Sequence, residues 1–299
     1  MNSHTPPEMR PVKLGVIGGS GLYNISGLEG SHWREVYSPF GKPSDKFLCG
    51  QLKNLDVVFL PRHGRDHVYL PSEINFRANI DALKRLNVTD IISISAVGSL
   101  QENFIPGDFV IIDQLIDQTF QRERSFFSKG LVAHVSMAEP VCNRLGDKLF
   151  DAAKTIANLN LKRGGTYITI EGPQFSSKAE SALYKNWGGS VIGMTNMPEA
   201  KLAREAEICY ATVAMVTDFD CWHPDHENVS VERVMKAVKD NAENAKKLVQ
   251  FFCNSLKNKR NFCTHKCDTS LQNAMMTKKG KEDPAVLKNL SAIIKRVDY

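Results

Sequence analysis

Two carboxylates that follow a long apolar run are the residues best placed for acid–base chemistry. Residues 208–216 are almost wholly apolar and lead into Thr217, Asp218, Phe219 and Asp220. Such a run is typical of a central strand covered on both faces, and open α/β sheets bind ligands where strands end. Side chains two apart on an extended chain point the same way, so Asp218 and Asp220 should face one site. The alternative is a turn in which an aspartate caps a helix.

A glycine-rich loop follows the first predicted strand, at residues 12–17. In residues 18–21 the glycines let backbone N–H groups approach an anion, and Ser20 adds a hydroxyl. The loop lacks the G-x-G-x-x-G spacing of dinucleotide-binding proteins and the Gly-Lys-Ser/Thr of a Walker loop. An ordinary turn is an equally good interpretation of this loop alone.

Cationic, hydroxyl and small residues follow three more predicted strands. Arg62 and His63 come after the strand at 56–60, and the rigid fork of an arginine suits phosphate oxygens. His67 lies four residues after His63, but on a loop this spacing is poor support for a metal site. Ser95 and Ala96 end the strand at 90–95, and Thr195 follows the strand at 190–194. A charged surface loop or a simple turn is the alternative at each place. One phosphate and one sugar bearing a base would use both the donors and the acids.

Predicted strands and helices alternate along the chain, which indicates an α/β fold. We expect a single domain with a central, mixed, largely buried β-sheet flanked by helices. Ser72 is the expected N-cap of the first helix, and Ser177 with Glu180 forms a capping box. The other predicted strands are residues 47–52, 108–113 and 165–170, and the other predicted helices are residues 141–157, 198–207 and 230–256.

The basic charge of this 299-residue chain lies at its C-terminal end. Residues 254–299 hold ten Lys/Arg and four Asp/Glu, leaving 28 basic and 29 acidic residues elsewhere. We expect a flexible N-terminus over 1–11, a main domain over 12–256, and a basic extension over 257–299 that is partly disordered and then helical. This extension is either a solvated or a docking appendage. No aromatic interleaving or groove-reading motif accompanies this charge, so a nucleic-acid partner is not expected.

Seven scattered cysteines indicate free thiols in a reducing compartment. Cys263 and Cys267 could suggest a metal clip, but the sequence shows no second ligand pair, so we interpret their spacing as chance and expect no metal. No signal region or membrane-spanning run is present, and we expect a cytoplasmic protein, with nuclear presence also open.

Taken together, these segments resemble the trimeric purine nucleoside phosphorylase family, in the branch that acts on S-methyl-5′-thioadenosine. The resemblance covers about residues 12–253. The matching stretches are residues 15–22, 39–45, 62–65, 168–177, 194–195, 198–200 and 217–222.

The resemblance implies phosphorolysis of the N-glycosidic bond, giving adenine and 5-methylthioribose 1-phosphate in methionine and purine salvage. Inorganic phosphate is a co-substrate, no cofactor is expected, and the implied assembly is a homotrimer with active sites at subunit interfaces. The implied phosphate contacts are Ser20, Arg62, His63, Ser95, Ala96 and Thr195. The implied substrate contacts are Met194 at the sugar, Phe175 at the purine, Asp218 at N7, Asp220 at the 6-amino group, and His67 and His134 near the methylthio pocket, in part from a neighbouring subunit.

Two residues are implied to set specificity, Ser176 and Val231. Relatives that use ordinary nucleosides have a histidine where this chain has Val231, which suits a thioether methyl group. The chain also departs from its relatives, with Val97 in place of a cysteine and Gly193 in place of an asparagine. Three alternatives are a phosphorylase for 6-oxopurine nucleosides or methylthioinosine, a silent nucleoside-binding protein, and a dinucleotide-dependent oxidoreductase. The intact acids and phosphate donors argue against a silent nucleoside-binding protein. The absence of the G-x-G-x-x-G spacing argues against a dinucleotide-dependent oxidoreductase.

Overall fold

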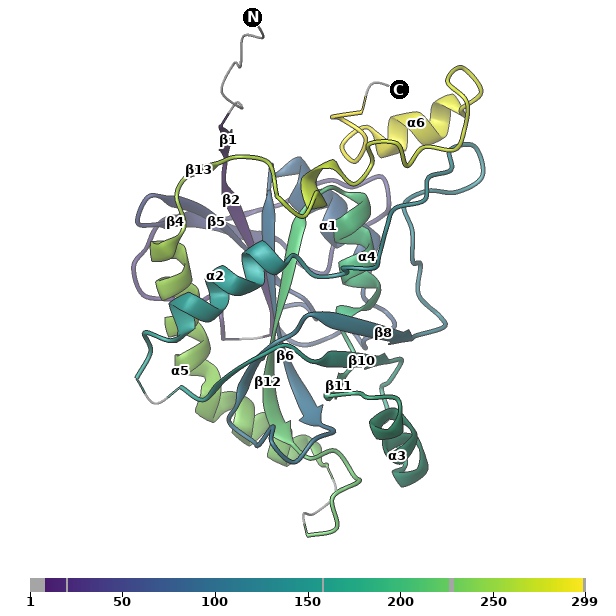
Figure 1. Ribbon diagram of the computed structural model, residues 1–299. Coiled ribbons are helices and arrows are strands. Elements are labelled where there is room, and N and C mark those ends of the chain that lie inside the picture. Colours follow the sequence, from purple (N-terminus) through teal and green to yellow (C-terminus); the bar gives the residue numbers. More distant parts are fainter. Residues whose placement is uncertain (1–8, 20, 158, 226–228, 298–299) are drawn as a thin grey trace, which may run out of the picture.

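A central mixed β-sheet with helices on both faces forms the body of the protein (Figure 1). The computed structural model describes residues 9–19, 21–157, 159–225 and 229–297. Eleven described strands form this sheet, and two more form a small separate one. The strands are β1 (Arg10–Pro11), β2 (Lys13–Gly18), β3 (Leu28–Arg34), β4 (Phe47–Leu52), β5 (Leu55–Pro61), β6 (Asp90–Ser99), β7 (Phe109–Ile111), β8 (Gln114–Gln118), β9 (Leu161–Arg163), β10 (Thr166–Ile170), β11 (Val191–Gly193), β12 (Cys209–Asp218) and β13 (Lys259–Arg260).

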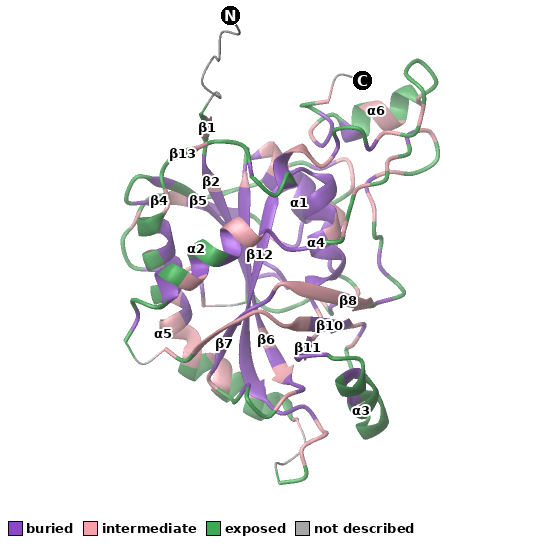
Figure 2. Ribbon diagram, in the orientation of Figure 1, coloured by how far each residue is buried: buried purple, intermediate pink, exposed green. Residues whose placement is uncertain are grey.

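The helices cover the two faces of this sheet and bury its middle strands (Figure 2). Alternate residues of β5 enter different clusters: Val57 packs with α2 and α5, whereas Val58 packs with α1 and α4. A strand buried on both faces needs apolar residues at every position, which explains the unbroken apolar run in β12. The helices are α1 (Phe76–Arg85), α2 (Asn143–Ala153), α3 (Lys178–Asn186), α4 (Asn196–Glu205), α5 (Val231–Ser255) and α6 (Pro284–Leu290).

Strand β6 is the centre of the sheet, and one of its edges is left open midway. Along one edge it pairs with β12 in parallel from Asp90 to Gly98. Along the other edge it pairs with β2 only as far as Ser93, and with β11 only from Gly98 onward. No described strand pairs with residues 94–97 on that second edge. The backbone of this stretch is therefore free to meet a ligand, as at the switch points of other open α/β sheets.

The single-domain α/β fold is confirmed, and most element bounds agree with the sequence to within a few residues. The capping box of Ser177 and Glu180 is present at the start of α3. The N-cap of α1 is Asn75, whose side chain accepts from Ala78 N, and the prediction of Ser72 was wrong. Strands β3, β8 and β9 were not predicted, because each is short or alternates polar and apolar residues weakly.

The basic C-terminal extension contacts the body, as in the docking alternative, although many of its residues are exposed. Strand β13 pairs antiparallel with β1 at the other end of the chain. Leu271, Leu290 and Ile293 are fully buried or nearly so in the cluster that contains α1 and α4. These apolar residues are scattered without a regular period, so their packing could not be predicted. No described helix has the length and apolar character needed to cross a membrane.

Candidate active site

A cavity of about 280 Å³ lies beside the open edge of β6. The ends of β2, β5, β6, β11 and β12 surround it, together with the start of α4 and the N-terminal half of α5. The predicted site residues that line it are Arg62, His63, His67, Ser95, Ala96, Phe175, Ser176, Met194, Thr195, Asp218 and Asp220. Ser20 lies outside the described residues, but Gly19 and Gly21 on either side of it line the same cavity.

Arg62 is held rigidly by a buried carboxylate that was not among the predicted site residues. Its Nε donates to Glu199 Oε2 at 2.9 Å and its Nη2 to Oε1 at 3.2 Å, and both side chains are 2% exposed. Ser93 accepts from Nη2 at 2.6 Å and in turn donates to Glu199. Among the described residues, Nη1 has one acceptor, Ile94 O at 3.2 Å. Since Nη1 carries two hydrogens, its second N–H is available to a ligand in the cavity.

His63 is neutral and has a defined tautomer. Its Nδ1 lies 2.9 Å from Tyr69 O, and because a carbonyl only accepts, Nδ1 carries the hydrogen. Burial lowers the pKa of His63 to about 4, so Nε2 is unprotonated at neutral pH. His67 stacks on this ring with the centroids 4.3 Å apart, and its backbone φ of 53° lies in the left-handed region. The stacked imidazole rings of His63 and His67 thus form one wall of the cavity.

Thr195 offers a hydroxyl that no described group satisfies. It is the N-cap of α4, yet its side chain makes no capping hydrogen bond, and Oγ1 is buried without a partner in the described part of the chain. A buried orphan hydroxyl costs free energy unless a ligand or water pairs with it. Thr195 is therefore well suited to a phosphate oxygen.

The two aspartates meet at the cavity in a turn, and the extended geometry expected for them was wrong. Strand β12 ends at Asp218, and Asp220 has a φ of 51°. Asp218 Oδ1 accepts from Asp220 N at 2.7 Å, which closes the turn and keeps both carboxyl groups against the cavity. A Cβ added at Gly98 would lie 3.0 Å from Asp218 Oδ1 and 3.3 Å from Asp220 Cβ, so this close approach requires a glycine.

The surroundings of the two acids favour retention of a proton. Burial raises the pKa of Asp218, against hydrogen bonds from Thr217 and from Asp220 N that lower it. Burial also raises the pKa of Asp220, and the charge of Asp218 adds to that rise. The Thr217 hydroxyl has one hydrogen but two acceptors, Asp218 Oδ2 at 2.7 Å and Val97 O at 3.1 Å. Thr217 can therefore donate to only one of these two acceptors at a time.

The length of β6 sets the distance between the cationic end and the acidic end of the cavity. Arg62 donates a hydrogen bond to Ile94 O, and Asp218 and Asp220 pack against Gly98. Four residues of strand separate these two positions, which is a span of about 13 Å at about 3.3 Å per residue. A nucleoside with a phosphate at its sugar can bridge such a span.

Two predicted residues do not line this cavity. Val231 begins α5 and is 67% exposed, one helical turn beyond Val234 and Met235, which do line it. The helical spacing of three and four residues puts Val231 on the same face, but past the end of the cavity. His134 lines a different cavity with Phe127 and Val135, and its backbone N donates to Ala274 O at 2.9 Å. A role from a neighbouring subunit remains a prediction for His134.

Two further features of the site were missed by the sequence analysis. Arg122 is buried and joins two segments that contribute to the cavity wall, because it donates to Glu171 Oε1 at 2.7 Å, Met194 O at 2.7 Å and Met197 O at 2.6 Å. Its position in a charged run gave no sign of burial. A Cβ at Gly193 would lie 2.1 Å from the Tyr167 hydroxyl oxygen. A side chain at Gly193 would therefore force the Tyr167 ring to move.

Comparison with known proteins gives matches over nearly the whole chain. A family model described as the phosphorylase superfamily matches residues 13–253. The S-methyl-5′-thioadenosine phosphorylase of Rhodospirillum rubrum is 58% identical, over 95% of this chain and 96% of its own. A solved methylthioadenosine phosphorylase from an antarctic soil metagenomic library is similar with a TM-score of 0.88 and 44% identity, over 95% of this chain and 99% of its own. Methylthioadenosine phosphorylase from Schistosoma mansoni in complex with adenine gives a TM-score of 0.76 and 36% identity, over 95% of this chain and 98% of its own.

Proposed function

This chain belongs to the phosphorylase superfamily, and we propose that it cleaves S-methyl-5′-thioadenosine with inorganic phosphate. A phosphate oxygen forms a bond to the sugar C1′, and the bond from C1′ to the purine N9 breaks. The bonding electrons leave with the purine, which gains a proton and departs as adenine. The sugar becomes 5-methylthioribose 1-phosphate. We propose that these products serve methionine and purine salvage.

The phosphate is proposed to bind where the donors gather. Arg62 offers its free Nη1 hydrogen, Thr195 its unpaired hydroxyl, and Ser95 and Ala96 the open backbone of β6. His63 Nε2 accepts a hydrogen from a protonated phosphate oxygen, because its Nδ1 is already committed to Tyr69 O. Gly19 and Gly21 of the glycine-rich loop line the same cavity, and contact of Ser20 with phosphate stays a prediction.

The purine is proposed to bind at the opposite end of β6, between Phe175 and the acid pair. As C1′–N9 breaks, negative charge collects on the purine, and a proton from Asp218 at N7 neutralises it. Burial raises the pKa of Asp218, which favours its protonated form more than in an exposed aspartate. Asp220 accepts from the 6-amino group, whereas a 6-oxo purine would present a lone pair to it. A polar mismatch of this kind can reject an analogue by about 10⁴-fold or more.

The 5′ end of the substrate is proposed to contact α5. Val234, Met235 and Val238 line the cavity from this helix and offer an apolar surface without a hydrogen-bond donor for a 5′-hydroxyl. A methylthio group suits that surface better than a hydroxyl, which would lose its hydrogen bonds to water. The specificity role predicted for Val231 is thereby assigned mainly to its neighbours one turn along.

One observation carries this proposal: the phosphate donors and the acid pair line a single cavity. The test is adenine release from S-methyl-5′-thioadenosine with and without phosphate, expected only with phosphate. Asp218→Asn should lower kcat by about 10²–10⁴-fold. The matched control is Asp240→Asn on the exposed side of α5, which should leave kcat unchanged. Equal rates with and without phosphate would refute phosphorolysis.

We further propose that the protein is a cytoplasmic homotrimer. The segment from residue 119 to 142 carries Phe120 and Val132, which are 72% and 39% exposed, and also His134. A second copy that covers these apolar side chains would bring His134 to its cavity. Sedimentation should give three chains per particle, and His134→Ala should raise the KM for the nucleoside. A fully active single chain would contradict this arrangement.

A further inference from the structure

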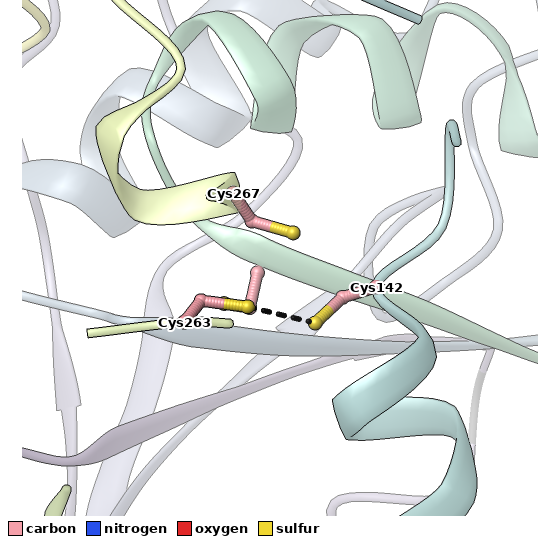
Figure 3. A group of neighbouring side chains, drawn as sticks. Cys142, Cys263 and Cys267 are labelled. Carbon is pink, nitrogen blue, oxygen red and sulfur yellow. Dashed lines mark hydrogen bonds between the residues drawn. The ribbon is translucent and has the colours of Figure 1, made fainter. Parts of the chain in front are cut away.

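Four of the seven cysteines meet in one buried cluster, far apart in sequence and outside the cavity described above. Cys142 is the N-cap of α2, Cys209 is the first residue of β12, and Cys263 and Cys267 lie in the C-terminal extension. All four are buried, and their Sγ atoms lie within 4.8 Å of one another. Figure 3 shows the thiols of Cys142, Cys263 and Cys267 converging from different segments. The second ligand pair, which the sequence did not reveal, is therefore Cys142 with Cys209.

The spacing of the sulfur atoms suits a single metal ion. A tetrahedral Zn²⁺ with Zn–S bonds of about 2.3 Å holds its sulfur atoms about 3.8 Å apart. The Sγ atoms of Cys142 and Cys263 are 3.5 Å apart, and the whole set stays within 4.8 Å. A disulfide requires about 2.05 Å. A polynuclear iron–sulfur cluster distributes its thiolates over several irons and so spreads them more widely.

The loop that supplies two of the thiols is already held in shape. Cys263 N donates to both oxygens of Asp268, at 3.0 and 3.1 Å. Lys266 N donates to Cys263 O at 2.9 Å, and Lys266 has a left-handed φ of 56°. Cys267 then begins a 3₁₀ turn (Cys267–Thr269). These bonds point the two sulfur atoms the same way before any metal binds.

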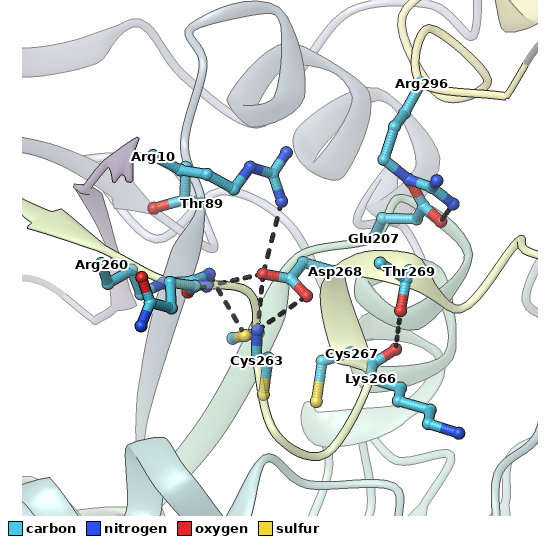
Figure 4. A network of polar contacts seen from close by, with 12 residues as sticks. Arg10, Thr89, Glu207, Arg260, Cys263, Lys266, Cys267, Asp268, Thr269 and Arg296 are labelled. Carbon is cyan, nitrogen blue, oxygen red and sulfur yellow. Dashed lines mark hydrogen bonds and ion pairs between the residues drawn. The ribbon is translucent and has the colours of Figure 1, made fainter. Parts of the chain in front are cut away.

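The charges around the cluster favour an anionic metal centre. Four thiolates on one divalent ion carry a net charge of −2. Arg260 Nη2 donates to Cys209 Sγ at 3.5 Å. Within the described part of the chain, Arg10, Arg144 and Arg260 share two carboxylates, Asp90 and Asp268. Figure 4 shows Arg10 and Arg260 converging on Asp268 beside Cys263. The surplus guanidinium charge offsets part of the negative charge of a tetrathiolate site.

We propose that Cys142, Cys209, Cys263 and Cys267 bind one Zn²⁺ as a closed structural site that fastens the C-terminal extension to α2 and β12. Four protein ligands and full burial leave no open position for a substrate, so the site stabilises the fold and takes no part in the reaction. Binding converts four thiols to thiolates and releases four protons. The site is independent of the proposed phosphorolysis.

The first experiment measures metal in the full-length chain purified without an affinity tag. Elemental analysis should find about one zinc per chain. Cys263→Ser with Cys267→Ser should reduce this at least tenfold. The matched control, Cys49→Ser with Cys253→Ser, changes two buried cysteines outside the cluster and should retain the zinc. Because a metal-free variant could also misfold, the zinc content of the unmodified chain decides the question by itself.

Three results would overturn the proposal. A folded, active chain without metal and with four titratable thiols at the cluster would show that the cysteines only pack together. A disulfide between any two of the four cysteines, detected by mass spectrometry, would show that a covalent bond and not a metal ion links them. One iron per chain in place of zinc would refute the metal assignment. A second readout is limited proteolysis, in which a strong chelator should expose the extension to cleavage at least tenfold faster, and added zinc should reverse this.

Discussion

Replacing the carboxylate that holds Arg62 should weaken both the fold and phosphate binding. In Glu199→Gln one carboxylate oxygen becomes an NH₂ group. At Oε1 this group would face the Ser93 and Tyr210 hydroxyls and Arg62 Nη2, and at Oε2 it would face Arg62 Nε. Either orientation sets donor against donor and leaves Arg62 charged and buried without its partner. Breaking a buried ion pair by removing one partner costs about 3–5 kcal/mol, so the free energy of unfolding should fall by about that amount.

The assay has an equilibrium part and a kinetic part. Urea unfolding should give a lower midpoint with an unchanged slope, and the KM for phosphate should rise more than the KM for the nucleoside. Glu243→Gln on the exposed face of α5 is the matched control and should change the free energy of unfolding by less than about 0.5 kcal/mol. A variant with the stability and phosphate KM of the parent would show that Glu199 neither neutralises nor orients Arg62.

Three other predictions follow from the site. Asp220→Asn should lower kcat/KM for S-methyl-5′-thioadenosine and raise it for the 6-oxo analogue, and an unchanged ratio would remove Asp220 from base recognition. Because the pKa of His63 is about 4 in the folded chain and about 6.5 when unfolded, stability should be lost as pH falls from 6.5 to 4. His63→Gln should flatten that slope in urea titrations, while exposed His32→Gln should not. Gly193→Ala should destabilise by about 1–3 kcal/mol, since its Cβ would meet the Tyr167 hydroxyl at 2.1 Å, and Tyr167→Phe should restore part of the loss.

The sequence predicts the sheet well because its signals are local. The apolar run in β12 and the capping box at Ser177 each depend on a few adjacent residues. The strand ends that carry Arg62, Thr195 and Asp218 were found in the same way. The residues that were missed depend on contacts between distant segments. Glu199 pairs with a residue 137 positions away, and Arg122 joins segments 49 to 75 positions away.

The cysteine cluster could not be predicted from the sequence either, because it also depends on a contact between distant segments. A spacing rule requires both ligand pairs to be short motifs, and only Cys263 and Cys267 form one. Cys142 and Cys209 are 67 positions apart, and they approach because Cys142 N donates to Tyr210 O at 2.8 Å, which brings the start of α2 to the start of β12. Periodicity and spacing contain no information on that contact.

The buried ion pair at Arg62 has a consequence for the chemistry. Glu199 neutralises the guanidinium, so the groups proposed to contact phosphate are one remaining N–H, a hydroxyl, backbone groups and a neutral imidazole that accepts a hydrogen. Such a site orients phosphate without cancelling its negative charge. As the glycosidic bond breaks, the sugar becomes cation-like, and an anion held beside C1′ stabilises it more in the transition state than in the ground state. A second cation in the cradle would strengthen phosphate binding but weaken this attraction, so a lysine introduced at Ser95 should lower the KM for phosphate and lower kcat as well.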